Sequence, residues 1–305
     1  MAFAVELVDV RKSFGDVEAV RGVSLAVERG EVFGIVGPNG AGKTTTLEMV
    51  EGLRAPDSGE IRVLGDPVWP HPDRIQRRIG VQLQNSAFFE FLSTRELLEL
   101  FARFYGPVVP ARIDAVLETV GLEGKAGARV SELSGGQQQR VAIALALVHE
   151  PEIVFLDEPT TGLDPQARRN LWDVVRAIHD EGRTVILTTH YMEEAEQLCE
   201  RVAIMDEGLV VALDTPRELV HGLGPGGVIA FEGGPDRALL SSLAGVREAH
   251  AEDGGWELST ASIRSTLPEL LALAEQQDTE MGWLTVRRRS LEDVFLALTG
   301  REYRE

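Results

Sequence analysis

The sequence predicts an α/β protein built on a largely parallel sheet, followed by a smaller α+β domain. Apolar runs at 32–36, 153–158 and 185–189 are typical of buried central strands, and helical patterns follow them. Glycine and proline cluster at 222–227, where the pattern of strands and helices changes. A chain of 305 residues is long enough for one large or two ordinary cores.

The glycine-rich loop after the first of these strands is the strongest functional signal. It lies between a strand and a helix, the context that a phosphate-binding loop requires, which favours this interpretation over a glycine-rich turn without a ligand. Backbone N–H groups and the helix N-terminus would form an anion site. Lys43 would supply charge to the β- and γ-phosphates, and Thr44 a hydroxyl to Mg²⁺. The predicted loop comprises Gly37, Pro38, Asn39, Gly40, Ala41, Gly42, Lys43, Thr44 and Thr45.

Titratable side chains follow the other two buried strands. Asp157 and Glu158 end the run at 153–158, and His190 follows the run at 185–189. Parallel α/β sheets place ligand chemistry outside the carboxyl ends of their strands, so these residues should lie beside the loop. Asp157 can hold Mg²⁺, Glu158 can polarise an attacking water, and His190 is a candidate γ-phosphate sensor. The alternative of two solvated carboxylates is weak in a chain that already has a phosphate loop.

Three other candidates leave two interpretations open. Phe14, in a predicted turn at 12–15 after a predicted edge strand at 3–10, could stack on a purine, although a core aromatic is the favoured interpretation. Gln84, at the end of a short strand at 79–83, could reach a metal or water, or be a solvated amide. Ser134, Gly135 and Gly136 could form a second anion site at a helix start, or an ordinary serine cap with flexible glycines.

The remaining segments indicate organisation rather than chemistry. Helices are expected at 94–105, 113–120 and from 134 to 149. After a linker at 223–227, residues 228–305 have the order β-α-β-β-α-β, which resembles a ferredoxin-like unit. We interpret this region as a packing or partner-contact module. The arginines at 287–289 are interpreted as a solvated strand end rather than an anion site.

Composition excludes several classes of protein. The net charge of −19 argues against nucleic acid as a partner and against general attraction to anionic lipid. No apolar run reaches the ~18–20 residues that span a bilayer, and no secretory signal is visible at the N-terminus. The single cysteine, Cys199, rules out an intrachain disulfide and fits a reducing compartment.

Four separated motifs together resemble the ATP-binding cassette (ABC) family. They are the loop at 37–45, Leu-Ser-Gly-Gly-Gln at 133–137, Phe-Leu-Asp-Glu-Pro-Thr at 155–160 and Thr-Thr-His at 188–190. Their order and spacing match one complete cassette over residues 3–220. The Leu-Ser-Gly-Gly-Gln element is the most specific of the four, because other P-loop NTPases lack it. The end of the chain at 290–300 resembles ABC-2 type exporter ATPases of the drug-resistance kind.

This resemblance implies a P-loop NTPase fold at 1–222, with a mixed core sheet, a small antiparallel β subdomain and a helical subdomain at about 86–150. It also implies roles for residues outside the loop. Phe14 would stack on adenine, Gln84 would touch Mg²⁺ together with Thr44 and Asp157, and His190 would contact the γ-phosphate. Glu158 would be the general base. The signature Ser134, Gly135, Gly136 and Gln137 would close over ATP bound to another cassette, and Asp164 belongs to a loop that crosses between protomers.

The resemblance therefore predicts an ATPase subunit of an exporter, which uses ATP and Mg²⁺. Because the signature completes a site only in trans, a head-to-tail homodimer with two composite ATP sites is expected. A separate transmembrane permease should contact residues 85–105 and hold the subunit at the cytoplasmic face of the membrane. Cargo contacts are expected in that permease. The alternatives are a soluble, non-transport ABC ATPase and an importer ATPase.

Overall fold

A computed structural model describes residues 3–83, 88–89, 91–252, 254–279 and 281–300 of the chain. Contacts divide the chain into two compact units, and the division falls between Pro216 and Arg217, before the predicted linker. Within the described ranges, no helix is long and apolar enough to cross a bilayer.

A mixed six-stranded sheet forms the centre of the first unit, as the sequence predicts. Its strand order is β10-β9-β3-β8-β7-β6, with every neighbouring pair parallel except β10 and β9. All residues of β3, β7 and β8 are buried, which explains their continuous apolar sequences. The strands are β3 (Val32–Val36), β6 (Ile79–Gln82), β7 (Ile153–Asp157), β8 (Thr184–Thr189), β9 (Arg201–Asp206) and β10 (Leu209–Asp214).

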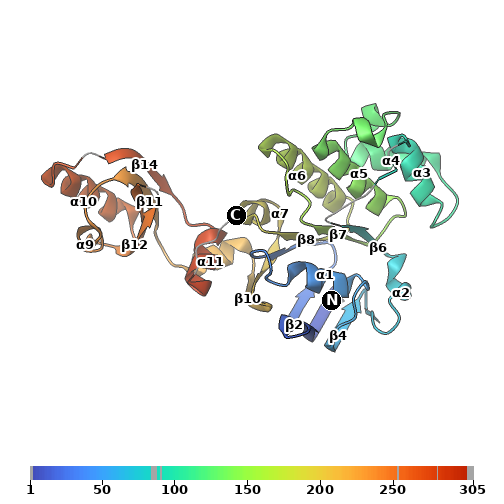
Figure 1. Cartoon of the computed structure of the whole chain (residues 1–305), viewed down its shortest axis with the longest axis horizontal. Helices are drawn as coiled ribbons and strands as arrows, with labels where there is room; N and C mark the ends of the chain where they lie inside the picture. Colours follow the sequence, from blue (N-terminus) through green and yellow to red (C-terminus); the bar gives the residue numbers. More distant parts are fainter. Residues whose placement is uncertain (1–2, 84–87, 90, 253, 280, 301–305) are drawn as a thin grey trace. The chain divides into compact units, whose positions relative to one another are not determined.

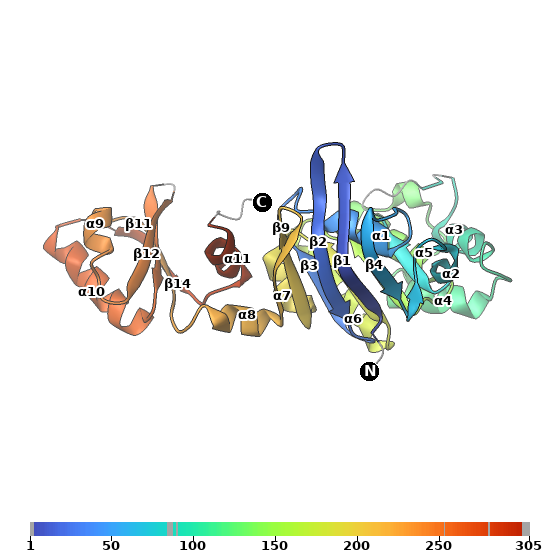
Figure 2. The same ribbon diagram turned by 90° about the horizontal axis from the view of Figure 1, so that it is seen from below.

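A second, antiparallel sheet in this unit has the order β2-β1-β4-β5 (Figure 2). Its strands are β1 (Val5–Phe14), β2 (Val17–Val27), β4 (Ser58–Val63) and β5 (Asp66–Pro67). The prediction of an edge strand at 3–10 is wrong, because β1 pairs with β2 on one side and β4 on the other. The predicted turn at 12–15 is also wrong, because β1 continues to Phe14. Asp57 holds this end of the strand, where it accepts hydrogen bonds from the Lys12 side chain and from the Ser13 N–H.

Helices cover both faces of the central sheet (Figure 1). Helices α5 and α6 contact strands β6, β7 and β8 on one face, with α3 and α4 packed beside them, and α1 lies against β7 and β8 on the other. The helices are α1 (Lys43–Val50), α2 (Asp73–Gln76), α3 (Thr94–Ala102), α4 (Pro110–Thr119), α5 (Gly135–Leu147), α6 (Pro165–Asp180) and α7 (Met192–Leu198), with 3₁₀ turns at Glu123–Lys125 and Val130–Glu132. The helical segment predicted between residues 86 and 150 is thus present as α3, α4 and α5.

The main core of this unit lies between the two sheets and α1. Phe33 of β3, Phe155 of β7 and Leu47 of α1 are among its largest fully buried side chains. Burying a side chain of this size contributes about 1.5–3 kcal/mol. The helix that follows the glycine-rich loop is therefore held by apolar packing behind the loop.

The second unit contains a four-stranded antiparallel sheet of order β12-β13-β11-β14. The predicted order β-α-β-β-α-β and the closing helix are present, whereas the ferredoxin-like assignment stays a prediction. Ile229, Phe231 and Leu258 pack with Leu270 of α10 in a separate core. The elements are α8 (Pro216–Gly222), β11 (Gly227–Gly233), α9 (Arg237–Leu240), β12 (Val246–Glu252), β13 (Gly255–Thr260), α10 (Ile263–Gln276), β14 (Met281–Arg287) and α11 (Leu291–Thr299).

Candidate active site

The carboxyl ends of three adjacent strands bring the predicted site residues together. Strand β8 lies between β3 and β7, with Val36 opposite Thr189 and Asp157 opposite Thr188. The glycine-rich loop leaves β3 at this edge, His190 follows β8, and Glu158 follows β7. The sheet therefore places the loop, the carboxylates and the histidine beside one another, as expected from the sequence.

Two glycines of the loop stand where no other residue would fit. A Cβ atom at Gly37 would lie 2.1 Å from the Met205 carbonyl oxygen, and one at Gly42 would lie 2.4 Å from the Ala19 carbonyl oxygen. Gly42 also has a left-handed backbone and is the N-cap of α1, where no side chain makes a cap hydrogen bond in the described structure. The helix thus presents backbone amides and its positive dipole end to the loop, which is an arrangement suited to phosphate.

The Lys43 ammonium is held inside this loop. Lys43 is only 4% exposed, and its Nζ donates hydrogen bonds to the carbonyl oxygens of Gly37 (2.9 Å) and Pro38 (3.1 Å). The same Nζ lies 3.2 Å from Oε1 of Glu158. The ammonium therefore joins the loop to the carboxylate at the end of β7, and a phosphate in the loop would compete with Glu158 for it.

Asp157 faces the hydroxyl of Thr44 across the start of α1. Thr44 Oγ1 lies 3.3 Å from Asp157 Oδ1, which also accepts a hydrogen bond from Thr188 Oγ1. Burial raises the pKa of Asp157, and the hydrogen bonds from Thr188 and Thr44 only partly oppose this effect. A carboxylate and a hydroxyl so close together form a hard oxygen donor set, which fits Mg²⁺.

Glu158 is buried but remains ionised at neutral pH. It is 7% exposed and has a left-handed backbone (φ 46°), fixed by hydrogen bonds from its N–H to the carbonyl and hydroxyl oxygens of Thr188. Its Oε2 lies 3.1 Å from His190 Nδ1 and accepts a hydrogen bond from Thr161. Burial by itself would raise the pKa of Glu158, but the charges of Lys43 and His190 outweigh the effect of burial, so the pKa is lowered. An ionised carboxylate at this position can accept a proton from water.

Two groups that support His190 were not predicted from the sequence. The ring of Tyr191 packs at 4.2 Å from the His190 ring, and the guanidinium of Arg168 lies 3.8 Å from the centre of the Tyr191 ring. Arg168 belongs to α6, so this stack ties the histidine to the neighbouring helix. An arginine on a helix surface carries no sequence signal for such a contact.

Glu194 is the second unpredicted feature near the site. It is fully buried on α7 and accepts hydrogen bonds from Trp172 Nε1 (3.0 Å) and Thr160 Oγ1 (3.1 Å). Burial raises its pKa, against the hydrogen bonds that it accepts. Glu194 therefore links the segment after Glu158 to the helix after His190.

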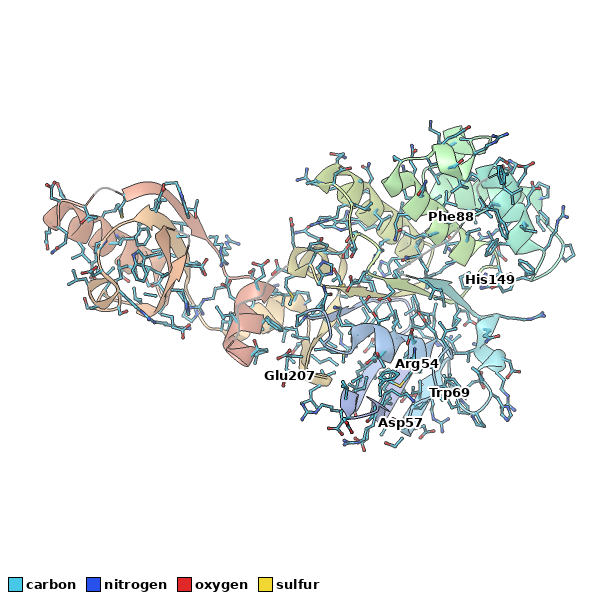
Figure 3. The ribbon with its side chains drawn as sticks, in the orientation of Figure 1. Arg54, Asp57, Trp69, Phe88, His149 and Glu207 are labelled. Atoms are coloured by element: carbon cyan, nitrogen blue, oxygen red, sulfur yellow. The ribbon has the colours of Figure 1, made fainter. Side chains whose placement is uncertain are left out.

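The position of Phe14 contradicts the favoured core interpretation. Phe14 is 43% exposed at the end of β1, and the guanidinium of Arg54 lies 4.9 Å from the centre of its ring. Figure 3 shows Arg54 and Asp57 on the part of the unit formed by α1 and the antiparallel strands. An aromatic ring on the surface beside a cation is available for stacking on a flat base.

The signature residues lie at the start of α5. Ser134 is an N-cap that accepts a hydrogen bond from the Gln137 N–H, while the Gln137 side chain accepts one from the Ser134 N–H. The cap interpretation is therefore confirmed, and the anion site stays a prediction. Asp164 is the N-cap of α6, where its Oδ1 accepts hydrogen bonds from two backbone N–H groups. Ser134, Gly135 and Asp164 are exposed, and Gln84 lies outside the described residues.

Comparison with known proteins agrees with this geometry. Residues 20–161 match the family described as "ABC transporter". The Nod factor export ATP-binding protein I of Burkholderia lata is 41% identical over 99% of this chain and 98% of its own length. The chain belongs to the ABC transporter family. The protein of the same name from Rhizobium etli is 42% identical to this ABC subunit over 98% of the chain and 94% of its own length.

Solved ABC structures resemble the first unit. The cbiO1 protein of Clostridium perfringens, described as part of an ABC transporter complex, matches with a TM-score of 0.67, at 29% identity over 72% of this chain and 91% of its own. A dimeric bacterial ABC cassette, MJ0796, matches with a TM-score of 0.63, at 30% identity over 69% of this chain and 98% of its own. The first unit is accordingly an ABC ATPase domain, which binds and hydrolyses ATP.

Proposed function

We propose that this chain is the ATP-hydrolysing subunit of an ABC exporter, active as a homodimer with a separate membrane permease at the cytoplasmic face. The observation that carries the proposal is the joined cluster of Lys43, Thr44, Asp157, Glu158 and His190 at one sheet edge. The full-length similarity to proteins named for export supports the direction of transport.

The loop and its neighbours would bind the nucleotide. Backbone amides at 37–45 and the Lys43 ammonium would hold the phosphates. Thr44 and Asp157, with Gln84, would hold Mg²⁺, which neutralises phosphate charge when it is bound. Phe14 would stack on adenine, since its ring is exposed beside the antiparallel sheet.

Glu158 would act as the general base on the attacking water. Its lowered pKa keeps it ionised, and His190 fixes one of its oxygens from 3.1 Å. Phosphate binding would draw the Lys43 ammonium away from Glu158 Oε1, because the phosphate and the carboxylate compete for that ammonium. His190 would then contact the γ-phosphate from the adjacent strand end.

A second copy would complete each site. In the signature of Ser134, Gly135, Gly136 and Gln137 the cap uses the N–H groups of Ser134 and Gln137, so the amides of the two glycines would face ATP bound by the other copy. Asp164 is exposed at the neighbouring helix start, where a partner could contact it. Two ATP molecules between two cassettes would close the dimer, and hydrolysis would reopen it.

The permease would bind near the start of the helical segment. Phe91 is 85% exposed there, and the side chains of Phe89 and Phe104 are also largely exposed. Exposed apolar side chains that lie near one another in the chain, such as Phe89 and Phe91, are typical of an interaction surface. Affinity capture from native membranes should therefore recover a multispanning membrane protein, and capture of ribosomes instead would contradict the exporter proposal.

The decisive experiment on the site is Glu158→Gln. We expect ATP binding to remain and steady-state hydrolysis to fall about a hundredfold or more, since the variant lacks the general base. An ATP-dependent dimer should accumulate, measured by size-exclusion chromatography with light scattering. Glu193→Gln, an exposed acid on α7, is the matched control and should hydrolyse ATP normally. Normal hydrolysis by Glu158→Gln would refute its role.

A further inference from the structure

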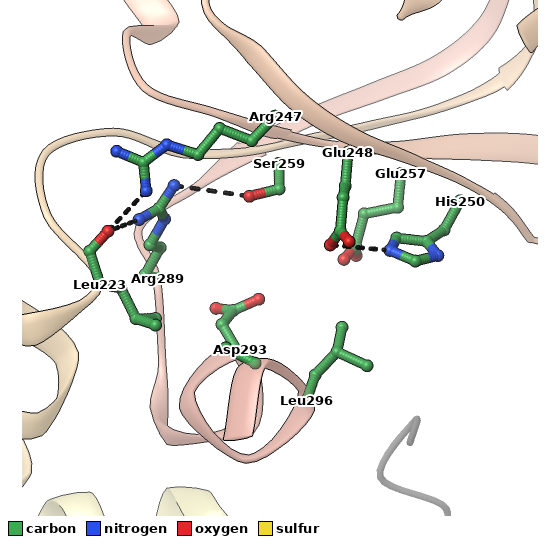
Figure 4. Close-up of a pocket in the computed structure, with 10 residues that line it drawn as sticks. Leu223, Arg247, Glu248, His250, Glu257, Ser259, Arg289, Asp293 and Leu296 are labelled. Atoms are coloured by element: carbon green, nitrogen blue, oxygen red, sulfur yellow. Dashed lines mark hydrogen bonds and ion pairs between the residues drawn. The ribbon is translucent and has the colours of Figure 1, made fainter. Parts of the chain in front are cut away.

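The second unit contains a polar pocket that the ATPase site does not use (Figure 4). Its volume is about 280 Å³, near the lower end of the range for small-molecule sites. One face of the antiparallel sheet and the helix α11 enclose it. The lining residues are Leu223, Arg247, Glu248, His250, Glu257, Ser259, Arg289, Asp293, Leu296 and Ala297.

A bulge in β12 brings basic and acidic side chains to the same face of the sheet. The register between β12 and β13 passes from Val246 opposite Thr260 to Glu248 opposite Ser259, so Arg247 is the extra residue. Bulges of this kind redirect a side chain relative to its neighbours. Arg247 and Glu248 consequently line the same pocket although they are consecutive in the strand.

Arg247 and Arg289 form one wall of the pocket. Arg247 Nη1 donates a hydrogen bond to the Leu223 carbonyl oxygen (2.6 Å), and Arg289 donates to the same oxygen. Among the residues that the structure describes, no carboxylate lies within ion-pair distance of either guanidinium. Burial and then the charge of Arg247 lower the pKa of Arg289, and the charge of Asp293 partly opposes them. The terminal nitrogens of Arg289 already donate to protein oxygens, so the donors left for an anionic group are chiefly those of Arg247, with the charge of Arg289 beside them.

The interpretation of 287–289 as a solvated strand end is therefore wrong for two of its arginines. Arg287 lies between Asp293 (2.7 Å) and Glu257 (3.3 Å) and ties α11 to the sheet. Arg289 is partly buried and also donates hydrogen bonds to the carbonyl oxygens of Thr260 (3.2 Å) and Gly224 (3.4 Å) and to Ser259 Oγ (3.4 Å).

Acidic side chains form the opposite wall. Figure 4 shows Arg247 and Arg289 at one side, with Glu248, Glu257 and His250 at the other. Glu257 already has Arg287 as a partner, whereas Glu248 is exposed and lies 3.2 Å from the His250 ring nitrogen. A simple anion would be repelled by this wall. No group of three metal-binding side chains occurs in the described part of the chain, which disfavours a metal ion.

We propose that this pocket binds a small zwitterion of the amino-acid class. The carboxylate would lie against Arg247 and Arg289, and the ammonium would lie against Glu248. Leu296 and Ala297 of α11 would contact the apolar part of the ligand. Since the lining comes from both the sheet and α11, the ligand would stabilise the packing of that helix against the sheet. Ligand binding would thereby regulate the second unit.

Calorimetric titration of the full-length protein with the standard amino acids tests this inference. We expect one or a few to bind, and acetate, methylammonium and inorganic phosphate not to bind at the same concentration. Arg247→Gln and Glu248→Gln should each weaken binding about tenfold or more, because each removes a charged hydrogen-bond partner. Arg264→Gln, an exposed arginine on α10 away from the pocket, is the control and should bind normally.

Each other outcome would overturn the inference. Absence of binding by every amino acid would exclude the ligand class, and equal binding of acetate or phosphate would show a plain anion site. Binding that survives in both pocket variants, or that Arg264→Gln also loses, would place the ligand elsewhere. Hydrogen exchange of α11 with and without the bound amino acid gives an independent readout, since the ligand should slow exchange there.

Discussion

The carboxyl group of Glu51 should make the stability of the first unit depend on pH. Glu51 lies at the C-terminal end of α1, is 2% exposed, and its Oε1 has no hydrogen-bond partner in the described part of the chain. Burial, and then the charges of Asp157 and Glu48, raise its pKa from 4.5 to about 8. The folded state therefore holds this proton more tightly than the unfolded state does.

The sign and size of the effect follow from this difference. The stabilisation by the bound proton is fully present below pH 4.5 and is lost as the pH rises toward 8. At about 1.4 kcal/mol per pH unit, the loss between pH 6 and pH 8 is on the order of 2 kcal/mol. Glu51→Gln keeps the shape of the side chain without the titration, so its stability relative to wild type should increase with pH by about this amount.

Urea unfolding, followed by tryptophan fluorescence, measures this difference. In a background of Trp256→Phe and Trp283→Phe, the remaining tryptophans, Trp69 and Trp172, report on the first unit alone. The midpoints of wild type and Glu51→Gln should diverge as the pH rises from 6 to 8. Glu118→Gln, an exposed acid on α4, is the control and should show no divergence. A difference that stays constant with pH would refute the reasoning.

Three further substitutions test other parts of the molecule. Lys43→Ala should weaken ATP binding about tenfold or more in a fluorescent-nucleotide titration, because the loop loses its buried ammonium; unchanged affinity would contradict the loop assignment. Glu194→Gln should lower kcat more than it changes KM, since an amide replaces a buried carboxylate that accepts hydrogen bonds from Trp172 and Thr160. A normal kcat would show that hydrolysis does not depend on these hydrogen bonds. Phe231→Ala should destabilise the second unit by about 3–5 kcal/mol, measured by fluorescence of its own tryptophans, with little change in ATP hydrolysis; loss of hydrolysis would show that the two units are energetically coupled.

The strands that position the site were predictable from local sequence. Uninterrupted apolar runs in β3, β7 and β8 reflect burial on both faces, and a parallel sheet gathers their carboxyl ends. That rule alone places Lys43, Glu158 and His190 near one another. The contacts between them, at 3.1–3.2 Å, agree with it.

Features that depend on distant partners were not predictable. Strand β1 is internal only because residues 58–63 pair with it, and its alternating pattern does not encode that partner. Glu193 is exposed and Glu194 is fully buried, although the two are neighbours, because only the second faces Trp172. Arg247 and Arg289 likewise meet through a bulge and one shared carbonyl group.

The ion pair between Lys43 and Glu158 suggests how nucleotide binding could prepare the base. In the structure, Lys43 is the largest influence that lowers the pKa of Glu158, against the effect of burial. Phosphate that draws the ammonium away would remove this influence, so the pKa of Glu158 would rise and the carboxylate would become a stronger proton acceptor. The same step frees Oε1 for a water molecule, because that oxygen is the one that faces Lys43. Binding of phosphate and activation of the base would then be consequences of a single change of partner by Lys43.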